Sequence, residues 1–265
     1  MKHGLVLPNW VAGADVRRLI DAAVAAEVSG WDGVFLADHL IFPPPPELGA
    51  ASTVTEHWDM PDPWISLAAI AVSTATITLG TWVTPVARRL PWQTARDIAT
   101  LDRLSAGRVM LGVGLGRRPD YELFGYPWSL KWAAERTDEA LDVITRLWSG
   151  QSVTHSGPHF DLDKVTLLPT PYQSPRVPIV IGGLWPRRPA VRRGAQWDGI
   201  MVHFPGDGVL PADETPPREH AGNMIRYYRS VTTANNGEVF LPMRPENEGS
   251  EWIDLCRELE ATWLY

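Results

Sequence analysis

The stretch that decides the fold is residues 77–116, ITLGTWVTPVARRLPWQTARDIATLDRLSAGRVMLGVGLG. Its first residues, 77–81, are mostly β-branched or apolar and predict a buried strand. Pro91 then begins a helical segment that runs to about Ser105, and residues 108–113 predict a second buried strand. Strand, helix and strand in this order form a crossover between parallel strands, which requires helices packed on the sheet. We therefore expect a parallel α/β fold with its ligand at the carboxyl ends of the strands.

The same alternation continues through the rest of the chain. Apolar runs predict eight strands, at 5–7, 34–37, 77–81, 108–113, 178–181, 199–202, 239–241 and 262–264. Helical patterns separate nearly all of them, near 16–24, 62–74, 91–105, 130–148, 187–195, 217–231 and 249–261. Eight strands alternating with helices over 265 residues predict a (β/α)8 TIM barrel, with a doubly wound open sheet as the alternative.

One long connection interrupts this pattern before the fifth expected strand. Residues 152–177 contain two short β-type segments on either side of Gly157-Pro158, which predicts an inserted β-hairpin. No linker or low-complexity tract divides the chain, so residues 1–265 are expected to form one domain. A barrel of this kind usually ends in a helix after strand eight, whereas this sequence ends at Tyr265. A missing final helix would leave one flank of strands eight and one less covered. Either a homodimer partner shields that flank, the last strand is irregular, or the natural chain is longer.

Composition narrows the class of protein. The net charge of −7 does not provide the basic surface that nucleic-acid binding needs. With Cys256 as the single cysteine, no internal disulfide can form, which fits a reducing compartment. The apolar run at the amino terminus is too short for a signal peptide, and no stretch is long enough to span a membrane. We expect a cytoplasmic protein without a nucleic-acid or membrane partner.

Asp38 and His39 directly follow the second expected strand, at the rim where barrel enzymes hold their catalytic groups. A histidine at this place can serve as general base, general acid or charge stabiliser near neutral pH. The alternative is that Asp38 caps a turn and His39 is an ordinary, partly buried rim residue.

Glycines and arginines mark the ends of the next strands. Residues 112–116 contain three glycines, and Gly182-Gly183 precede a helix start, so a ligand could approach the backbone closely at both places. Ordinary tight turns are the alternative, and Arg117 breaks the dinucleotide-binding fingerprint. Arginine pairs follow these strands at 88–89, 117–118 and 187–188, with a fourth pair at 192–193. We expect one or two of these arginines to bind phosphate or carboxylate groups.

Metal and hydrolase signatures do not occur in this sequence. It contains no HExxH, no paired CxxC and no nucleophile elbow of a serine hydrolase. A metal-free organic cofactor is therefore favoured, and a metal-dependent barrel hydrolase is the weaker alternative.

Several motifs resemble one family in their order along the chain. They are GWDGVFLADHL at 30–40, LGT and VTP at 79–85, PWQTAR at 91–96, TLDRLS at 100–105, GRV at 107–109, GVG at 112–114, IGG at 181–183, WDG at 197–199 and ATW at 261–263. Together they resemble the luciferase-like flavin-dependent oxidoreductases over essentially the whole chain. The resemblance implies a (β/α)8 barrel with an insertion before strand five.

The resemblance also implies a bound FMN or deazaflavin F420, with its ring over the barrel mouth. A non-prolyl cis peptide, here matched to Thr81–Trp82, would support the ring, and the phosphate would lie near residues 114–116 and 181–183. Asp38-His39 resembles the version found in F420-dependent members, in which the histidine supports hydride transfer and the aspartate lies by the cofactor. The cofactor-binding residues implied in this way are Asp38, Thr81, Trp82, Val83, Thr84, Gly114, Leu115, Gly116, Ile181, Gly182 and Gly183.

The preferred function is F420-dependent hydride transfer to or from a small organic substrate, with Asp38 and His39 as the catalytic pair. An FMN-dependent monooxygenase that uses reduced FMN and O2 is the alternative within enzymes, and a catalytically silent flavin-binding protein is the alternative outside them. An aromatic or apolar substrate is expected from the residues that we place around the pocket, which are Trp10, His57, Trp58, Trp185 and His203.

Overall fold

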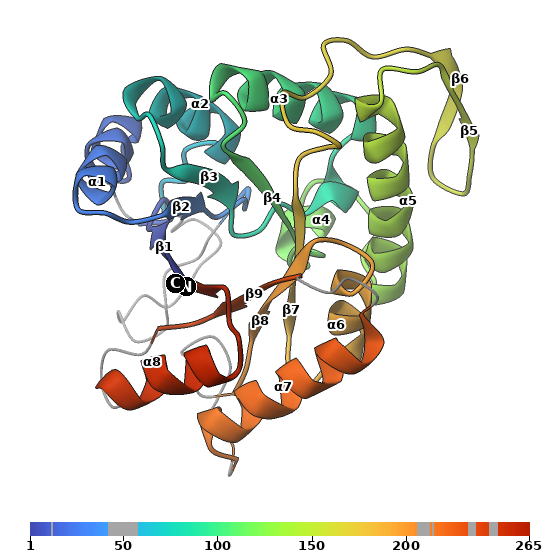
Figure 1. Cartoon of the computed structure of the whole chain (residues 1–265). Coiled ribbons are helices and arrows are strands. Elements are labelled where there is room, and N and C mark those ends of the chain that lie inside the picture. The colour runs from blue at the N-terminus through green and yellow to red at the C-terminus, as the bar shows by residue number, and fades with distance from the viewer. Residues whose placement is uncertain (12, 42–57, 206–212, 214, 233–236, 244–248) are drawn as a thin grey trace.

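Eight parallel strands close into a barrel in the part of the chain that the structure describes (Figure 1). The computed structural model describes residues 1–11, 13–41, 58–205, 213, 215–232, 237–243 and 249–265. The barrel strands, in their order around the ring, are β1 (Lys2–Leu7), β2 (Gly33–Leu36), β3 (Thr78–Thr81), β4 (Val109–Val113), β7 (Ile179–Leu184), β8 (Gly199–His203), β9 (Glu238–Leu241) and β10 (Trp263–Leu264). The closed parallel barrel confirms the expected fold class and excludes the open sheet. All eight expected strands are present, displaced at their ends by a few residues at most.

Helices lie outside the ring of strands (Figure 1). They are α1 (Val16–Val28), α2 (Pro63–Ser73), α3 (Pro91–Leu104), α4 (Pro119–Glu122), α5 (Leu130–Trp148), α6 (Arg188–Gly194), α7 (Pro217–Val231) and α8 (Gly249–Glu258), with a 3₁₀ turn η2 (Val86–Arg88) after β3. Short polar side chains begin several of these helices. Asp15 accepts a hydrogen bond from the amide of Arg17 at 2.7 Å, and Ser129 accepts one from the amide of Trp132 at 3.0 Å.

The expected insertion before the fifth barrel strand is a two-stranded antiparallel hairpin. Its strands are β5 (Val153–Ser156) and β6 (Asp161–Val165), and they project from the barrel beside α5 (Figure 1). Glu139 of α5 fastens the hairpin to the barrel, because its carboxylate accepts hydrogen bonds from His155 and from the backbone amides of residues 159 and 160. At the other end of the sequence, β10 pairs with both β1 and β9 and closes the ring, and Tyr265 follows it directly.

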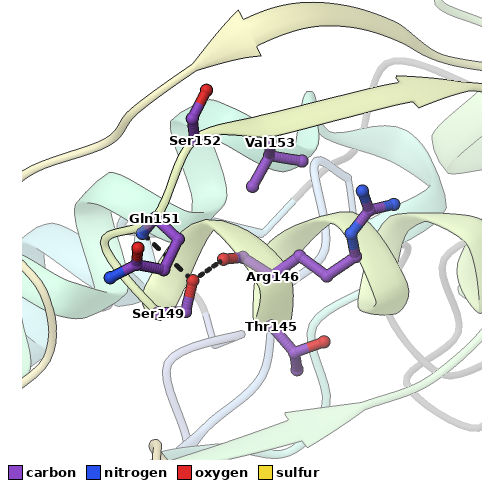
Figure 2. Close-up of a pocket in the computed structure, with 6 residues that line it drawn as sticks. All are labelled: Thr145, Arg146, Ser149, Gln151, Ser152 and Val153. Carbon is purple, nitrogen blue, oxygen red and sulfur yellow. Dashed lines mark hydrogen bonds between the residues drawn. The ribbon is translucent and has the colours of Figure 1, made fainter.

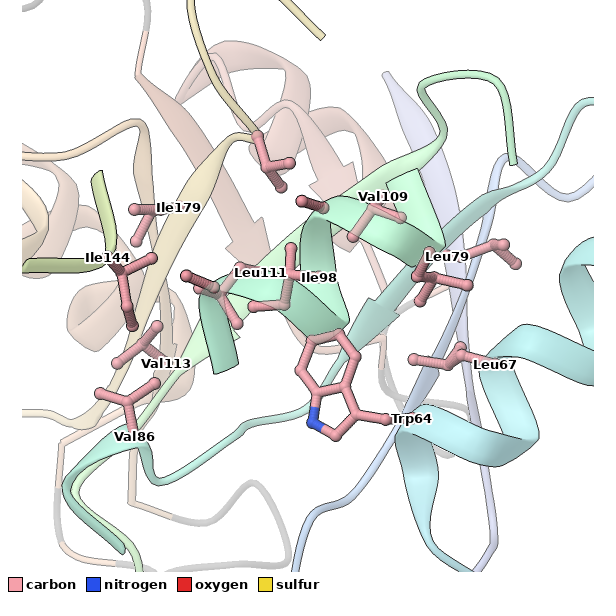
Figure 3. Close-up of a cluster of buried hydrophobic side chains, with 14 of the residues drawn as sticks. Trp64, Leu67, Leu79, Val86, Ile98, Val109, Leu111, Val113, Ile144 and Ile179 are labelled. Atoms are coloured by element: carbon pink, nitrogen blue, oxygen red, sulfur yellow. The ribbon is translucent and has the colours of Figure 1, made fainter. Parts of the chain in front are cut away.

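Two apolar layers hold the barrel. Side chains that point outward from the strands pack against the helices, as Leu79 and Val109 illustrate beside Ile98 of α3 in Figure 3. A smaller cluster fills the barrel interior and consists of Phe35, Met110, Val180, Met201, Phe240 and Trp263. Because Phe240 and Trp263 stack at 5.0 Å and Phe35 meets both rings edge to face, the interior is a packed core and not a channel.

The register brings the ends of β2 and β3 together. Leu36 pairs with Thr81, so the residues that follow each strand leave the barrel side by side. These residues are Ala37-Asp38-His39 and Trp82-Val83-Thr84, and they include most of the expected site. Among the described residues, no helix combines the length and apolar composition needed to cross a membrane.

Candidate active site

Asn9 fixes the backbone where β2 ends. Its side chain is fully buried and forms two hydrogen bonds of 2.9 Å with Ala37, one to the carbonyl oxygen and one from the amide. The same amide side chain thus satisfies both backbone groups of the residue before Asp38. This doubly bonded contact holds the start of the Asp38-His39 segment to the end of β1.

Asp38 lies below the surface, where two arginines surround its carboxylate. Its side chain is 2% exposed, and Arg88 donates to one oxygen while Arg89 and Thr84 donate to the other, at 3.2 and 2.9 Å. Arg88 is also buried, with a side chain 5% exposed. The carboxylate of Asp38 is therefore used within the protein, so we expect it to organise the site and not to touch a ligand directly.

His39 is the neighbour that reaches the mouth of the barrel. Its side chain is 20% exposed, and its Nδ1 lies 2.7 Å from Oδ2 of Asp120, whose side chain is 1% exposed. The other oxygen of Asp120 accepts hydrogen bonds from the backbone amides of Leu40 and Ile41, at 2.8 and 3.3 Å. One buried carboxylate thus holds both the imidazole and the chain that follows it.

The electrostatic surroundings keep Asp120 ionised. Burial raises the pKa of Asp120, but the hydrogen bond and charge of His39, the amide of Leu40 and the charge of Arg88 outweigh burial. The net result is a pKa of Asp120 below its ordinary value. The carboxylate can therefore accept a hydrogen bond from His39 throughout the neutral pH range.

Trp82 and Val83 form the part of the mouth that adjoins β3. The expected non-prolyl cis peptide is present, but it joins Trp82 to Val83 and not Thr81 to Trp82. The position expected from the sequence was wrong by one residue because Thr81 still belongs to the strand. Its register is kept by the amide of Trp82, which donates to Leu36 at 2.7 Å, and by the Thr81 hydroxyl, which donates to the carbonyl of Gly112 at 2.9 Å.

Aromatic rings cover the barrel interior at this end. The ring of Trp82 lies 3.9 Å from that of Tyr265 and 5.7 Å from that of His203, measured between ring centroids. Trp82 also contacts the interior ring of Phe35 edge to face, at 6.3 Å. Trp82, Val83 and Tyr265 are only partly buried and pack on the interior cluster, so they form an apolar floor below the mouth.

The structure gives the glycines at the ends of β4 and β7 a packing role that sequence reasoning did not identify. A Cβ atom on Gly114 would lie 2.3 Å from Cγ2 of Val83, and one on Gly182 would lie 2.9 Å from Cγ1 of the same residue. Gly116 has a φ of +78° and adjoins Tyr121, whose hydroxyl donates to the carbonyl of Leu115 at 2.7 Å. These glycines therefore make room for Val83 and Tyr121, whether or not a ligand also approaches them.

The remaining expected site residues divide into those at the mouth and those in the core. Gly183 and Leu115 are partly exposed, whereas Ile181 is 2% exposed and packs in the outer apolar layer. Trp185 was expected to line the pocket, but it is 7% exposed and belongs to the core beside α6 and α7. Trp10 and Trp58 are partly exposed, and His57 lies outside the described residues.

Several of the paired arginines are bound within the protein. Arg118 bonds Glu122, Arg193 bonds Asp138, and Arg192 lies 3.3 Å from the hydroxyl of Tyr227. Arg188 lies over the Tyr227 ring at 4.8 Å. Arg117 and Arg187 are exposed just past β4 and β7, where an anionic ligand group could meet them.

Two surface hollows lie away from this site. One, of about 390 Å³, is bordered by the last turn of α5 and the start of β5, where Ser149 bonds the carbonyl of Arg146 (Figure 2). The other, of about 600 Å³, is bordered by Lys2, Glu238 and Thr262, at the amino-terminal ends of β1, β9 and β10. Neither includes a carboxyl end of a barrel strand, where barrel folds bind their ligands. Within the described residues, no group of three or more His, Cys, Asp or Glu side chains could hold a metal ion.

Asp120 is the site residue that sequence reasoning missed. It lies 81 positions beyond His39, in a segment where the arginines at 117 and 118 are the more conspicuous candidates. The available signal was an acidic residue next to Pro119, in the loop that follows a barrel strand. Asn9, two residues after the end of β1, has the same kind of position and was also missed.

Comparisons with known proteins identify the family to which the chain belongs. The model of the luciferase-like monooxygenase family matches residues 1–238. An F420-dependent glucose-6-phosphate dehydrogenase of Nakamurella multipartita is 37% identical over 170 residues, which are 63% of this chain and 47% of that protein. A phthiodiolone/phenolphthiodiolone dimycocerosates ketoreductase of Mycobacterium kansasii is 32% identical over 212 residues, which are 76% of this chain and 55% of that protein.

The fold is likewise shared with solved structures. The crystal structure of monooxygenase RslO1 from Streptomyces bottropensis aligns with a TM-score of 0.71 at 22% identity, covering 98% of this chain and 77% of that one. At this identity the likeness concerns the fold alone. The chain spans about half the length of the curated relatives that it matches. From the family match and the barrel together, the chain belongs to the luciferase-like monooxygenase family, whose members are F420- or flavin-dependent oxidoreductases.

Proposed function

We propose that this protein catalyses F420-dependent hydride transfer between an alcohol and the corresponding carbonyl compound. The observation that carries the proposal is His39, a partly exposed imidazole at the carboxyl end of β2 that a buried carboxylate holds at 2.7 Å. Two relatives support the choice of reaction, because their names describe a dehydrogenase that uses F420 and a ketoreductase. Oxidation of an alcohol and reduction of a ketone are the two directions of one reaction.

The residues at the barrel mouth fit a deazaflavin. A planar ring system needs an apolar surface to lie on, and the floor of Trp82, Val83 and Tyr265 provides one above a sealed core. The phosphate-bearing tail needs cationic groups, and Arg117 and Arg187 are exposed past the ends of β4 and β7. We therefore assign Trp82 and Val83 to the ring and the two arginines to the anionic tail.

When bound, F420 supplies a ring carbon that accepts a hydride from substrate or returns it. The reaction also needs a group that exchanges the hydroxyl proton, because the alcohol loses a proton and a hydride together. We assign this exchange to His39: its imidazole would remove the proton as the alcohol is oxidised and return it when the carbonyl is reduced. Asp38 takes no part in this exchange, since Arg88, Arg89 and Thr84 occupy its carboxylate.

The substrate proposal concerns the aromatic side of the mouth. His203 and Tyr265 lie beside Trp82, with the His203 and Tyr265 rings 6.2 Å apart. Aromatic side chains form apolar surfaces, so we propose a substrate that carries an aromatic or apolar group next to its alcohol or ketone.

A homodimer is also part of the proposal, and sedimentation velocity of the purified protein would test it.

Cofactor choice is tested first, by titrating the purified protein with F420 and with FMN while following tryptophan fluorescence. We expect saturable binding of F420 and weaker binding of FMN. Micromolar binding of FMN without binding of F420 would overturn the proposal in favour of an FMN-dependent monooxygenase. Bound cofactor without turnover of any alcohol or ketone would favour a catalytically silent binding protein.

The role of His39 is tested by His39→Ala, with His3→Ala as the matched control. His3 lies near the amino-terminal end of β1, and its side chain is 44% exposed beside Asp32. We expect His39→Ala to lower kcat by about 10²- to 10⁴-fold while leaving F420 binding in place. His3→Ala should leave both unchanged. Normal turnover by His39→Ala would show that the imidazole is not the proton-exchanging group.

A further inference from the structure

Asp120 is placed to control which nitrogen of His39 carries the proton. A neutral imidazole has one N–H donor and one acceptor nitrogen, and the partner of one nitrogen decides the state of the other. At Nδ1 the partner is Oδ2 of Asp120, 2.7 Å away. Because the pKa of Asp120 lies below its ordinary value, this partner is an acceptor at neutral pH, so Nδ1 must donate.

The carboxylate itself cannot rotate away from His39. Its second oxygen accepts from the amides of Leu40 and Ile41, and Nη1 of Arg88 lies 3.8 Å from the same oxygen. Asp120 lies in the first turn of α4, and its side chain is 1% exposed. Water therefore does not compete strongly for either oxygen, and the orientation of the carboxylate is set by protein groups alone.

We propose that Asp120 is the positioning residue of His39: it holds Nδ1 as the donor and so leaves Nε2 as the nitrogen that exchanges a proton with substrate. Only the exchange of a proton with substrate rests on the proposed function, because the protonation of the ring can be measured without cofactor. The competing explanation is that Asp120 has a structural role only and anchors the backbone of residues 40 and 41.

Asp120→Asn distinguishes these explanations because of its neighbours. The two backbone amides at residues 40 and 41 need an acceptor, so the carbamoyl oxygen of the new side chain must face them. Its NH₂ group then faces Nδ1 of His39 and turns that nitrogen into an acceptor. The substitution keeps the shape and the anchoring of the backbone but reverses the protonation of the ring.

The first measurement is ¹⁵N NMR of the histidine rings in the cofactor-free protein, with His39 assigned by comparison with His39→Gln. At a pH where the ring is neutral, we expect His39 of the wild type to carry its proton on Nδ1, and Asp120→Asn to move that proton to Nε2. Asp213→Asn is the matched control, because it alters the His220–Asp213 pair, 2.8 Å apart, and should leave the His39 signals unchanged. A wild-type His39 protonated on Nε2 would overturn the proposal even if no variant folds, and so would an unchanged His39 in Asp120→Asn.

The second measurement is a kinetic cycle with F420 and substrate. Asp120→Asn should lower kcat by about 10²-fold or more, with little change in the KM for F420, because the ring presents the wrong nitrogen. In a His39→Ala background the same substitution should cause no further loss, since it acts only through His39. An equal loss in both backgrounds would favour the structural explanation and overturn the proposal. If the wild type shows no F420 turnover, the proposed function fails, while the NMR result still decides the role of Asp120.

Discussion

Gly114→Ala tests whether the glycines at the strand ends serve the protein or its ligand. The backbone of Gly114 lies outside the left-handed region, so alanine meets no conformational barrier there. The new Cβ would instead lie 2.3 Å from Cγ2 of Val83, well inside van der Waals contact. Either Val83 moves from its place in the floor or the ends of β3 and β4 separate.

The expected magnitude follows from two opposing effects. Overpacking costs about 1–3 kcal/mol, whereas replacing glycine by alanine at a compatible position gains about 0.4–1 kcal/mol. The net expectation for Gly114→Ala is a loss of about 1–2 kcal/mol in the free energy of unfolding. Val83→Ala removes both Cγ atoms and leaves a Cβ at 3.4 Å, which is ordinary contact. The double variant should therefore be more stable than the sum of the single effects predicts, by about 1–2 kcal/mol.

Urea denaturation of the four proteins measures this coupling energy. Gly222→Ala in α7 is the matched control, because the nearest described atom to its Cβ would be in the Arg226 guanidinium, at 3.5 Å. Combined with Val83→Ala, the control substitution should be additive. Additive effects for Gly114→Ala and Val83→Ala as well would refute the packing explanation. F420 binding to the double variant then addresses the ligand: binding restored together with stability indicates packing alone, and stability restored without binding indicates that the cofactor also approaches Gly114.

Three further substitutions test the framework around the site. Burial raises the pKa of Glu27, but hydrogen bonds from the backbone amides of residues 75–77 outweigh it and lower this pKa from 4.5 to about 2. The resulting stability is present above pH 4.5 and is lost as the pH falls toward 2, so Glu27→Gln should cost about 1–2 kcal/mol at pH 7, after allowance for solvent, and progressively less in acid. Urea curves that differ equally at pH 7 and pH 3 would contradict this. Asp38→Asn should cost about 3–5 kcal/mol in thermal and urea unfolding, because it removes the nearer of the two buried carboxylates that balance the charge of the buried Arg88; a variant as stable as the wild type would show that this buried ion pair does not contribute to stability. Asp102→Ala should cost about 1–3 kcal/mol, since its carboxylate accepts from the amides of residues 172 and 173, and faster hydrogen exchange at those two amides would identify the cause.

The barrel could be predicted from local sequence because the residue types within each strand differ from those of the segments around it. Residues 77–81 and 109–113 consist of apolar or β-branched residues with one glycine each, as is typical of strands buried on both faces. The position of His39 at the rim was predictable for the same reason, because that prediction requires only that the end of one strand be located in the sequence. The short strand at Trp263–Leu264 was predicted from its residue types, and the hairpin from the Gly157-Pro158 turn between two short β-type segments.

The partners of the site residues could not be predicted in this way. Whether Asp120 reaches His39 depends on how the loop after β4 folds across the end of β2, and no local pattern encodes that distance. Trp185 was wrongly predicted to line the pocket. It follows a strand end and a glycine pair, yet its ring is buried in the core beside α6 and α7. Position relative to a strand predicts where a backbone lies, whereas side-chain direction depends on tertiary neighbours.

The buried charges explain why His39 is held so firmly. Asp38 and Asp120 lie on either side of Arg88, and Arg89 pairs with Asp38 from the more exposed side. Each of these charges would be costly to bury alone, so they are tolerated only as a set whose members satisfy one another. Removing either carboxylate leaves Arg88 with one buried counter-charge in place of two, and a shift of either strand end would separate the charges. A network with such a penalty for distortion has few alternative arrangements, which is the property that the role proposed for the His39 imidazole requires of its surroundings.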